Sequence, residues 1–221
     1  KINELDLKSF FSNNRKLTMT INTNKKNEKI TTLFSDYPKP LIKQYKFIKG
    51  FEEGVLDFYS LTKNGNSNSV LVIDNFKLQE VPILAKLLTL ASLQGVSDLL
   101  TGEGIRFTDF EMKFSNNKGL MTIQELYAIG PAISILLDGY IEPNKIISLR
   151  GTLVPATTIN RTIASIPLIG NLLVGKKVGE GVFGVSFKVK GSPKDLKTTV
   201  NPIKTLTPRF ITRTLEKIKK N

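Results

Sequence analysis

Alternating apolar and polar residues predict β-strands along most of the chain. Leu17, Met19 and Ile21 alternate with threonine and asparagine, a period of two that is typical of a strand with one buried face. Comparable runs predict strands at residues 30–34, 44–49, 54–62, 70–78, 120–127, 133–141, 146–154 and 183–189, and residues 200–202 close a short strand. Asn64-Gly65 is a typical hairpin turn. These patterns predict a mainly β fold with a curved, mostly antiparallel sheet.

The strand after Gly104 changes phase along its length. Its first apolar residues, Ile105 and Phe107, are odd-numbered, whereas the apolar residues from Phe110 onwards are even-numbered. An extra residue in one strand of a pair would bring both sets to the same face. We therefore predict a β-bulge near Thr108-Asp109.

Helical periodicity predicts about three helices. In residues 81–100, Leu84, Leu87, Leu88 and Ala91 recur at the spacing of one helix face. A second helix is expected within residues 156–174, interrupted by Pro167 and Gly170, and a third after Thr207, which suits an N-cap. The third helix is amphipathic and basic.

An internal repeat links the first two helices. Val81-Pro82 recurs 73 residues later as Val154-Pro155, and Gly102-Glu103-Gly104 recurs 77 residues later as Gly179-Glu180-Gly181. Each copy reads as strands, an apolar helix and a further strand, which favours repeated strand–helix units over residues 70–142 and 143–221. Chance similarity between two apolar helices is the alternative.

Composition excludes several kinds of chemistry. The chain of 221 residues contains no histidine and no cysteine, so imidazole bases, thiolate nucleophiles and the usual zinc ligands are absent. The net charge of +13 suits anionic partners, although the abundance of lysine, asparagine and isoleucine is also typical of an A+T-rich genome. No basic stripe is interleaved with aromatics, so we expect no nucleic acid partner.

The sequence pattern does not predict a membrane span. Residues 81–100 approach the required length but contain Lys86 and Asp98. The chain begins with Lys1 and without a signal peptide pattern, so we expect a fragment or a processed protein.

Motifs that resemble catalytic sites are incomplete. Residues 179–186 are similar to a kinase glycine-rich loop, but too few residues follow them. Residues 170–177 imitate a phosphate-binding loop with Lys177 in place of the magnesium-binding hydroxyl. Asp109 and Glu111, which share a face of their strand, and Glu52-Glu53, expected in a turn, are paired carboxylates of the kind that hydrolases use. Solvated surface residues are the simpler interpretation, and we expect no enzyme, no cofactor and no metal.

The chain from Val70 onwards resembles the C-terminal region of the AsmA-like family of bacterial envelope proteins (the AsmA, YhdP and TamB type). The matching segments are Ala91-Ser92-Leu93-Gln94-Gly95, Gly102-Glu103-Gly104-Ile105-Arg106-Phe107, Gly151-Thr152-Leu153-Val154-Pro155, Ile166-Pro167-Leu168-Ile169-Gly170-Asn171-Leu172-Leu173, Gly179-Glu180-Gly181, Val189-Lys190-Gly191-Ser192-Pro193 and Val200-Asn201-Pro202. Ile203-Lys204 and Arg209 depart from the family pattern. The resemblance divides the chain into a strand-rich end of a β-groove, residues 1–69, and the AsmA-like region, residues 70–221.

The resemblance implies a periplasmic bridge with an inner-membrane anchor outside this fragment. Such proteins are thought to carry phospholipids between the inner and outer membranes, in a β-groove.

The residues themselves suit such a groove. Apolar faces of three strands are expected to bind acyl chains through Phe110, Met112, Phe114, Ile133, Ile135, Leu137, Phe183, Val185, Phe187 and Val189. Contact with a membrane surface and its headgroups is expected from Ile166, Leu168, Ile169, Leu172, Leu173, Lys176, Lys177, Arg213 and Lys217. Two alternatives stay open: these faces form an ordinary core, or the protein is an envelope assembly or regulatory module that docks a partner protein.

Overall fold

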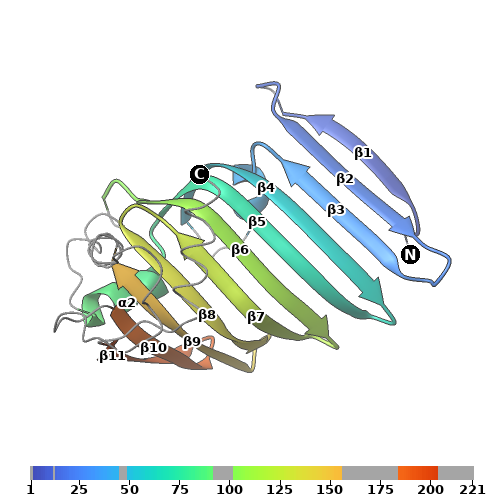
Figure 1. The fold of residues 1–221 in the computed structure, drawn as a ribbon. Coiled ribbons are helices and arrows are strands. Elements are labelled where there is room, and N and C mark those ends of the chain that lie inside the picture. Colours follow the sequence, from blue (N-terminus) through green and yellow to red (C-terminus); the bar gives the residue numbers. More distant parts are fainter. Residues whose placement is uncertain (1, 12, 45–48, 92–101, 156–183, 204–221) are drawn as a thin grey trace, which may run out of the picture.

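Eleven antiparallel strands form one sheet, in which each strand pairs with its neighbours in the chain (Figure 1). The computed structural model describes residues 2–11, 13–44, 49–91, 102–155 and 184–203. The strands are β1 (Leu5–Phe10), β2 (Lys16–Thr23), β3 (Lys29–Ser35), β4 (Lys49–Lys63), β5 (Asn66–Gln79), β6 (Ile105–Asn117), β7 (Leu120–Ile129), β8 (Ile133–Glu142), β9 (Ile146–Pro155), β10 (Gly184–Ser192) and β11 (Asp195–Ile203). The mainly β, antiparallel prediction is confirmed.

Two strands differ from their predictions. The sequence pattern did not predict β1, in which Leu5 and Leu7 alternate with charged residues over a short run. The strand predicted at residues 54–62 is confirmed, but β4 begins earlier, at Lys49. Most of the strand predicted at residues 44–49 lies outside the described residues. Glu53 and Gly54 have φ angles of 62° and 88°, which bend this strand without ending it. Glu52-Glu53 therefore lie within a strand, and their expected placement in a turn is wrong.

The described residues contain two helices, α1 (Lys39–Ile42) and α2 (Pro82–Leu90). The first part of the helix expected at residues 81–100 is thus confirmed, and residues 92–101 lie outside the described residues. The short α1 occupies a segment in which Pro38 and Pro40 predict a connection between strands and not a helix. The other two predicted helices fall on residues that the structure does not describe, so the repeated strand–helix unit stays a prediction. The predicted division of the chain at residue 69 also stays a prediction, and this position falls inside β5.

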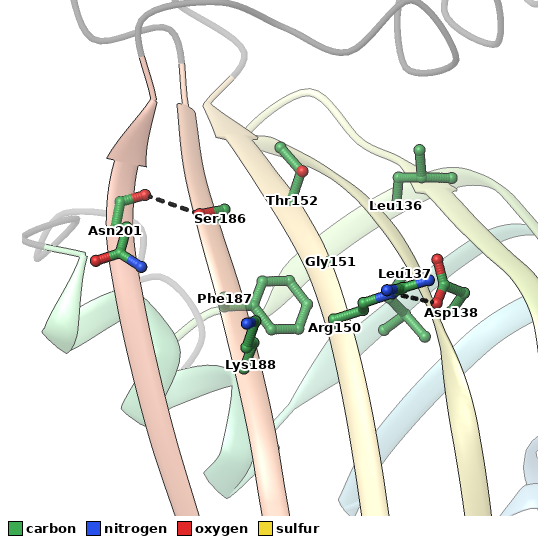
Figure 2. Close-up of a pocket in the computed structure, with 10 residues that line it drawn as sticks. All are labelled: Leu136, Leu137, Asp138, Arg150, Gly151, Thr152, Ser186, Phe187, Lys188 and Asn201. Carbon is green, nitrogen blue, oxygen red and sulfur yellow. Dashed lines mark hydrogen bonds and ion pairs between the residues drawn. The ribbon is translucent and has the colours of Figure 1, made fainter.

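Helix α2 lies on the concave face of the sheet, which curves around it (Figures 1 and 2). Its side chains Leu84, Leu87 and Leu88 are buried in one apolar core with residues from β4 to β10. Leu88 is completely inaccessible to solvent. Burial of each such side chain contributes roughly 1.5–3 kcal/mol, so this contact stabilises the curvature of the sheet.

A stack of three phenylalanine rings marks the bend in the sheet. Phe76 lies between Phe51 and Phe107, with centroid distances of 5.4 Å to each. Phe107 and Phe110 belong to the same core, so the predicted phase change in β6 is present. The predicted bulge at Thr108-Asp109 is wrong, because β5 and β6 keep equal residue counts there.

The phase change instead occurs in both strands together. Asn75 of β5 adopts the left-handed region, with φ of 52°, and brings Phe76 to the same face as Ile73. Asparagine tolerates this conformation better than most residues do.

An ion pair crosses the outer side of this bend. Arg106 donates two hydrogen bonds to the carboxylate of Glu53, at 2.8 and 3.0 Å. These bonds favour the charged form, so the pKa of Glu53 is lowered and that of Arg106 is raised.

We expect Arg106→Gln to return the pKa of Glu53 towards its ordinary value. A carboxylate with a depressed folded-state pKa stabilises the fold above its unfolded pKa, and this contribution is lost as the pH falls through the folded pKa. The variant should therefore lose less stability between neutral and acidic pH than the wild type. Carboxyl NMR titration measures the shift, and Glu28, whose pKa is lowered by Asn24 and Lys63, serves as the internal control. An unchanged Glu53 titration would contradict the assignment.

Candidate functional site

A row of apolar side chains crosses all eleven strands on the concave face. Residues that lie directly opposite each other in neighbouring strands project from the same face of a sheet. The strand registers connect Leu7, Met19, Leu33, Phe58, Leu71, Met112, Leu126, Leu137, Gly151, Phe187 and Val200 into one such row. The row runs perpendicular to the strands from one edge of the described sheet to the other.

Two parallel rows flank this central row and carry no charged residue. One contains Leu5, Ile21, Thr31, Ser60, Ser69, Phe114, Ile123, Gly139, Leu149, Val189 and Thr198. The other contains Ser9, Leu17, Ser35, Leu56, Ile73, Phe110, Ala128, Ile135, Leu153, Val185 and Pro202. We call the three rows the inner strip. The opposite face at the same levels carries charges, among them Asp6, Lys8 and Lys113.

Three buried serines of the inner strip have hydrogen-bonded hydroxyls, whereas the buried hydroxyl of Thr198, also in the strip, has no hydrogen-bond partner among the described residues. The Ser69 hydroxyl donates a hydrogen bond to that of Ser60 at 2.9 Å, and both side chains are buried. The buried Ser35 hydroxyl accepts a hydrogen bond from the backbone of Tyr37 at 3.1 Å. Paired hydroxyls cost far less in an apolar environment than unpaired ones.

A bulge in β7 keeps a carboxylate out of the inner strip. Strand β7 has one more residue than its neighbours between Ile123 and Leu126, on both its β6 and its β8 side. Ile123 and Leu126 therefore both face inwards, although three positions separate them. Glu125 lies opposite Lys113, on the outer face. Without the extra residue, strict alternation would leave either Ile123 or Leu126 facing outwards.

The exposure of the strip changes across the sheet. At the α2 end, Phe187 is only 4% exposed, whereas Leu7 on β1 is 39% exposed. Leu33, Phe58 and Leu71 are half-buried. The strip is thus covered at one end and accessible at the other.

Gly151 is the only member of the central row without a side chain. A Cβ atom at this position would lie 2.6 Å from Cζ of Phe187 and 2.7 Å from Cβ of Leu137. The Phe187 ring reaches across this position from β10 (Figure 2). The aromatic ring therefore fills the gap in the row and keeps it continuous.

The structure brings most of the predicted lipid-binding residues together. Eight of them lie in the inner strip: Phe110, Met112, Phe114, Ile135, Leu137, Val185, Phe187 and Val189. Ile133 is buried in the same core. Phe183 lies outside the described residues, as do the predicted membrane contacts Ile166, Leu168, Ile169, Leu172, Leu173, Lys176, Lys177, Arg213 and Lys217.

Sequence reasoning missed the part of the strip in β1 to β5. Met19, Leu33, Phe58 and Leu71 occupy the central row there. Their alternation was the available signal, but it does not show which strands are neighbours.

The predicted carboxylate pairs lie outside the inner strip and contact cations. Glu111 lies 2.9 Å from Lys113, Glu52 lies 3.4 Å from Lys39, and Glu53 pairs with Arg106. Asp109 shares the outer face with Glu111, as predicted. Within the described ranges, no three acidic residues gather as a metal site would require.

Comparison with known proteins adds no family to this description. The chain matches no protein-family model, no curated protein and no solved structure. Among the helices that the structure describes, none is long and apolar enough to cross a membrane.

We expect Gly151→Ala to destabilise the protein by about 1–3 kcal/mol, because the added methyl group must displace the Phe187 ring. Urea unfolding measures the change as a lower midpoint at constant slope. The double variant Gly151→Ala/Phe187→Leu should recover part of the loss, measured against Phe187→Leu alone. The added Cβ would still lie 2.4 Å from the Leu136 carbonyl oxygen, so recovery is incomplete. Full tolerance of the single variant would contradict this packing.

Proposed function

We propose that the protein carries phospholipids, with their acyl chains held on the inner strip. The observation that supports this proposal is the continuous absence of charge over three adjacent rows of an eleven-stranded sheet. The resemblance to AsmA-like proteins points the same way. On the basis of this resemblance, we propose that the chain belongs to a bridge between the two membranes of a bacterial cell envelope, lies in the periplasm, and is anchored in the inner membrane.

The dimensions of the strip suit this role. Strands in a sheet lie about 4.8 Å apart, so ten intervals span about 48 Å along the sheet. One leaflet of a bilayer core is about 15 Å thick, which is the length of an ordered acyl chain along its axis. The strip is therefore long enough for a lipid to occupy successive positions. Its three rows span about 13 Å along the strands, which is wider than a single chain.

The energetics favour retention without specific recognition. Each methylene group removed from water contributes about 0.8 kcal/mol, whatever the headgroup. A charged side chain in the strip would oppose this gain, because it loses hydration when an acyl chain covers it. A strip without charge therefore offers similar binding over its accessible part, in the strands nearest β1, which suits movement along that part. Such a carrier needs no catalytic group and no cofactor.

A docking module for an envelope protein is the second candidate. It is favoured by the exposed apolar residues at the β1 end. Leu7 of the inner strip is 39% exposed, Ile2 before β1 is 55% exposed, and Phe10 on the outer face of β1 is 64% exposed. In that case a partner protein would bind to the strip near β1, and the strip would hold no lipid.

We expect phospholipid to copurify with the chain and to be lost when a charge enters the strip. Leu71→Asp places a carboxylate in the central row between Phe58 and Met112, and should reduce bound lipid to less than about a fifth. Val70→Asp, one residue away on the outer face and opposite Lys113, is the matched control and should retain lipid. Native mass spectrometry with lipid extraction measures both.

A second pair of variants separates lipid loss from misfolding. Met19→Asp enters the strip near the accessible end, and Thr18→Asp places the same charge on the outer face of β2. Circular dichroism confirms the fold of each variant. Lipid retained in both strip variants, or a wild-type chain free of lipid, would overturn the proposal and favour the docking module.

A further inference from the structure

We propose a second binding surface, on the outer face of β8 to β11, that docks the protein on an anionic lipid bilayer. The surface faces away from the inner strip and is formed by different residues. Arg150, Lys188, Lys190 and Lys197 carry its positive charge, and we call these four residues the basic patch. All four side chains are exposed.

The basic patch places like charges directly opposite each other in neighbouring strands. Arg150 lies opposite Lys188, and Lys190 lies opposite Lys197. Such pairs destabilise a sheet, whereas opposite charges at the same positions stabilise it. A local arrangement that opposes folding is typical of a functional surface. Two such pairs in adjacent rows lower the stability of the sheet, which a face with a purely structural role would not require.

Negative charge within the described residues does not neutralise the patch. Asp138 accepts a hydrogen bond from Nε of Arg150 at 2.8 Å (Figure 2). In the part of the chain that the structure describes, Lys188, Lys190 and Lys197 have no carboxylate within ion-pair distance. The patch therefore retains an excess of positive charge that an anionic surface can neutralise.

A recess beside the patch is suited to a phosphate headgroup. It has a volume of about 340 Å³ and is bordered by Arg150 and Lys188 on one side and by Thr152, Ser186 and Asn201 on the other (Figure 2). The carboxylate of Asp138 also lines it, but this group is paired with Arg150. The volume falls at the lower end of the range for small-molecule sites, about 300–1,000 Å³. Hydroxyl and amide groups next to cationic groups bind phosphate oxygens through charge-assisted hydrogen bonds.

An exposed tyrosine extends the surface. Tyr140 is 38% exposed and lies in the same row as Lys190 and Lys197, with Ser148 between them. Tyrosine and basic residues together are typical of surfaces at the membrane–water interface. A nucleic acid site would call for several aromatic side chains on which bases stack, and this face of β8 to β11 presents one.

Docking through the basic patch would bring one end of the inner strip to the membrane. The patch lies on the strands that form the α2 end of the inner strip, since Lys188 follows Phe187 directly in β10. A bilayer bound there would hold that end of the strip close to the membrane surface. The proposed docking does not require that the strip binds lipid.

Vesicle cosedimentation of the whole chain tests the proposal. The probes are neutral phosphatidylcholine vesicles and the same vesicles with about a third anionic phosphatidylglycerol. We expect binding to the anionic vesicles only, and loss of that binding with salt. Lys188→Glu/Lys190→Glu should weaken it by at least about tenfold. Lys25→Glu/Lys26→Glu, the same change of charge in the β2–β3 turn, is the matched control and should bind within about twofold of wild type.

Stability provides an independent readout. Lys188→Glu creates an opposite-charge pair with Arg150, and Lys190→Glu creates one with Lys197, so the unfolding midpoint of the patch variant should rise while its vesicle binding falls. Copurified lipid should be unchanged in this variant, which distinguishes failure of the docking proposal from failure of the carrier proposal. Equal weakening in both double variants, equal binding to neutral vesicles, or selective loss of oligonucleotide binding in place of vesicle binding would overturn the proposal.

Discussion

The register of ten successive antiparallel strand pairs is the constraint on which the structure depends. Side chains alternate between the two faces of a strand, so a slip of one residue in any pair would move every later apolar residue to the wrong face. The described strands avoid this over the whole sheet, from Leu7 in β1 to Val200 in β11. Where the sequence itself breaks the alternation, the backbone compensates, through the left-handed Asn75 in β5 and the extra residue in β7.

The consequence is a sheet with two chemically different faces. The concave face has a strip without charge, and the opposite face carries charged residues at the same levels, including those of the basic patch. The core around α2 stabilises one end of the sheet, whereas the strands nearest β1 leave apolar side chains accessible. A sheet that covers only part of its apolar face keeps the rest available for a ligand, and this asymmetry underlies the proposed carrier.

Much of the fold could be predicted from the sequence because its signals are local. Alternation identified β2, β3 and most strands from β5 to β11, and the spacing of Leu84, Leu87 and Leu88 identified α2. Strand β1 was missed because a short edge strand buries too little to require a clear pattern. The bend at Glu53-Gly54 was read as a break, since the pairing that continues through it is a property of the neighbouring strand.

The candidate site could likewise be predicted from the sequence only in part. The apolar faces of β6, β8 and β10 were visible as separate alternating runs, but the continuous strip depends on strand order and register, which join residues far apart in the chain. The bulge predicted near Thr108-Asp109 is wrong because the apolar phase change in β6 accompanies the left-handed Asn75 of its partner strand β5. The bulge in β7 was not predicted from the sequence. The basic patch could not be predicted from the sequence, because strand pairing brings together Arg150, Lys188 and Lys197, which are dispersed along the chain.

Photocrosslinking with a phospholipid that carries a diazirine near the middle of one acyl chain tests the central claim most directly. The unmodified chain is loaded with this lipid and irradiated, and the adducts are mapped by peptide mass spectrometry. The account predicts adducts on inner-strip residues of several strands, such as Met19, Leu71 and Met112, and none on their outward neighbours Thr18, Val70 and Lys113. Adducts spread equally over both faces, or confined to the exposed edge at β1, would contradict it.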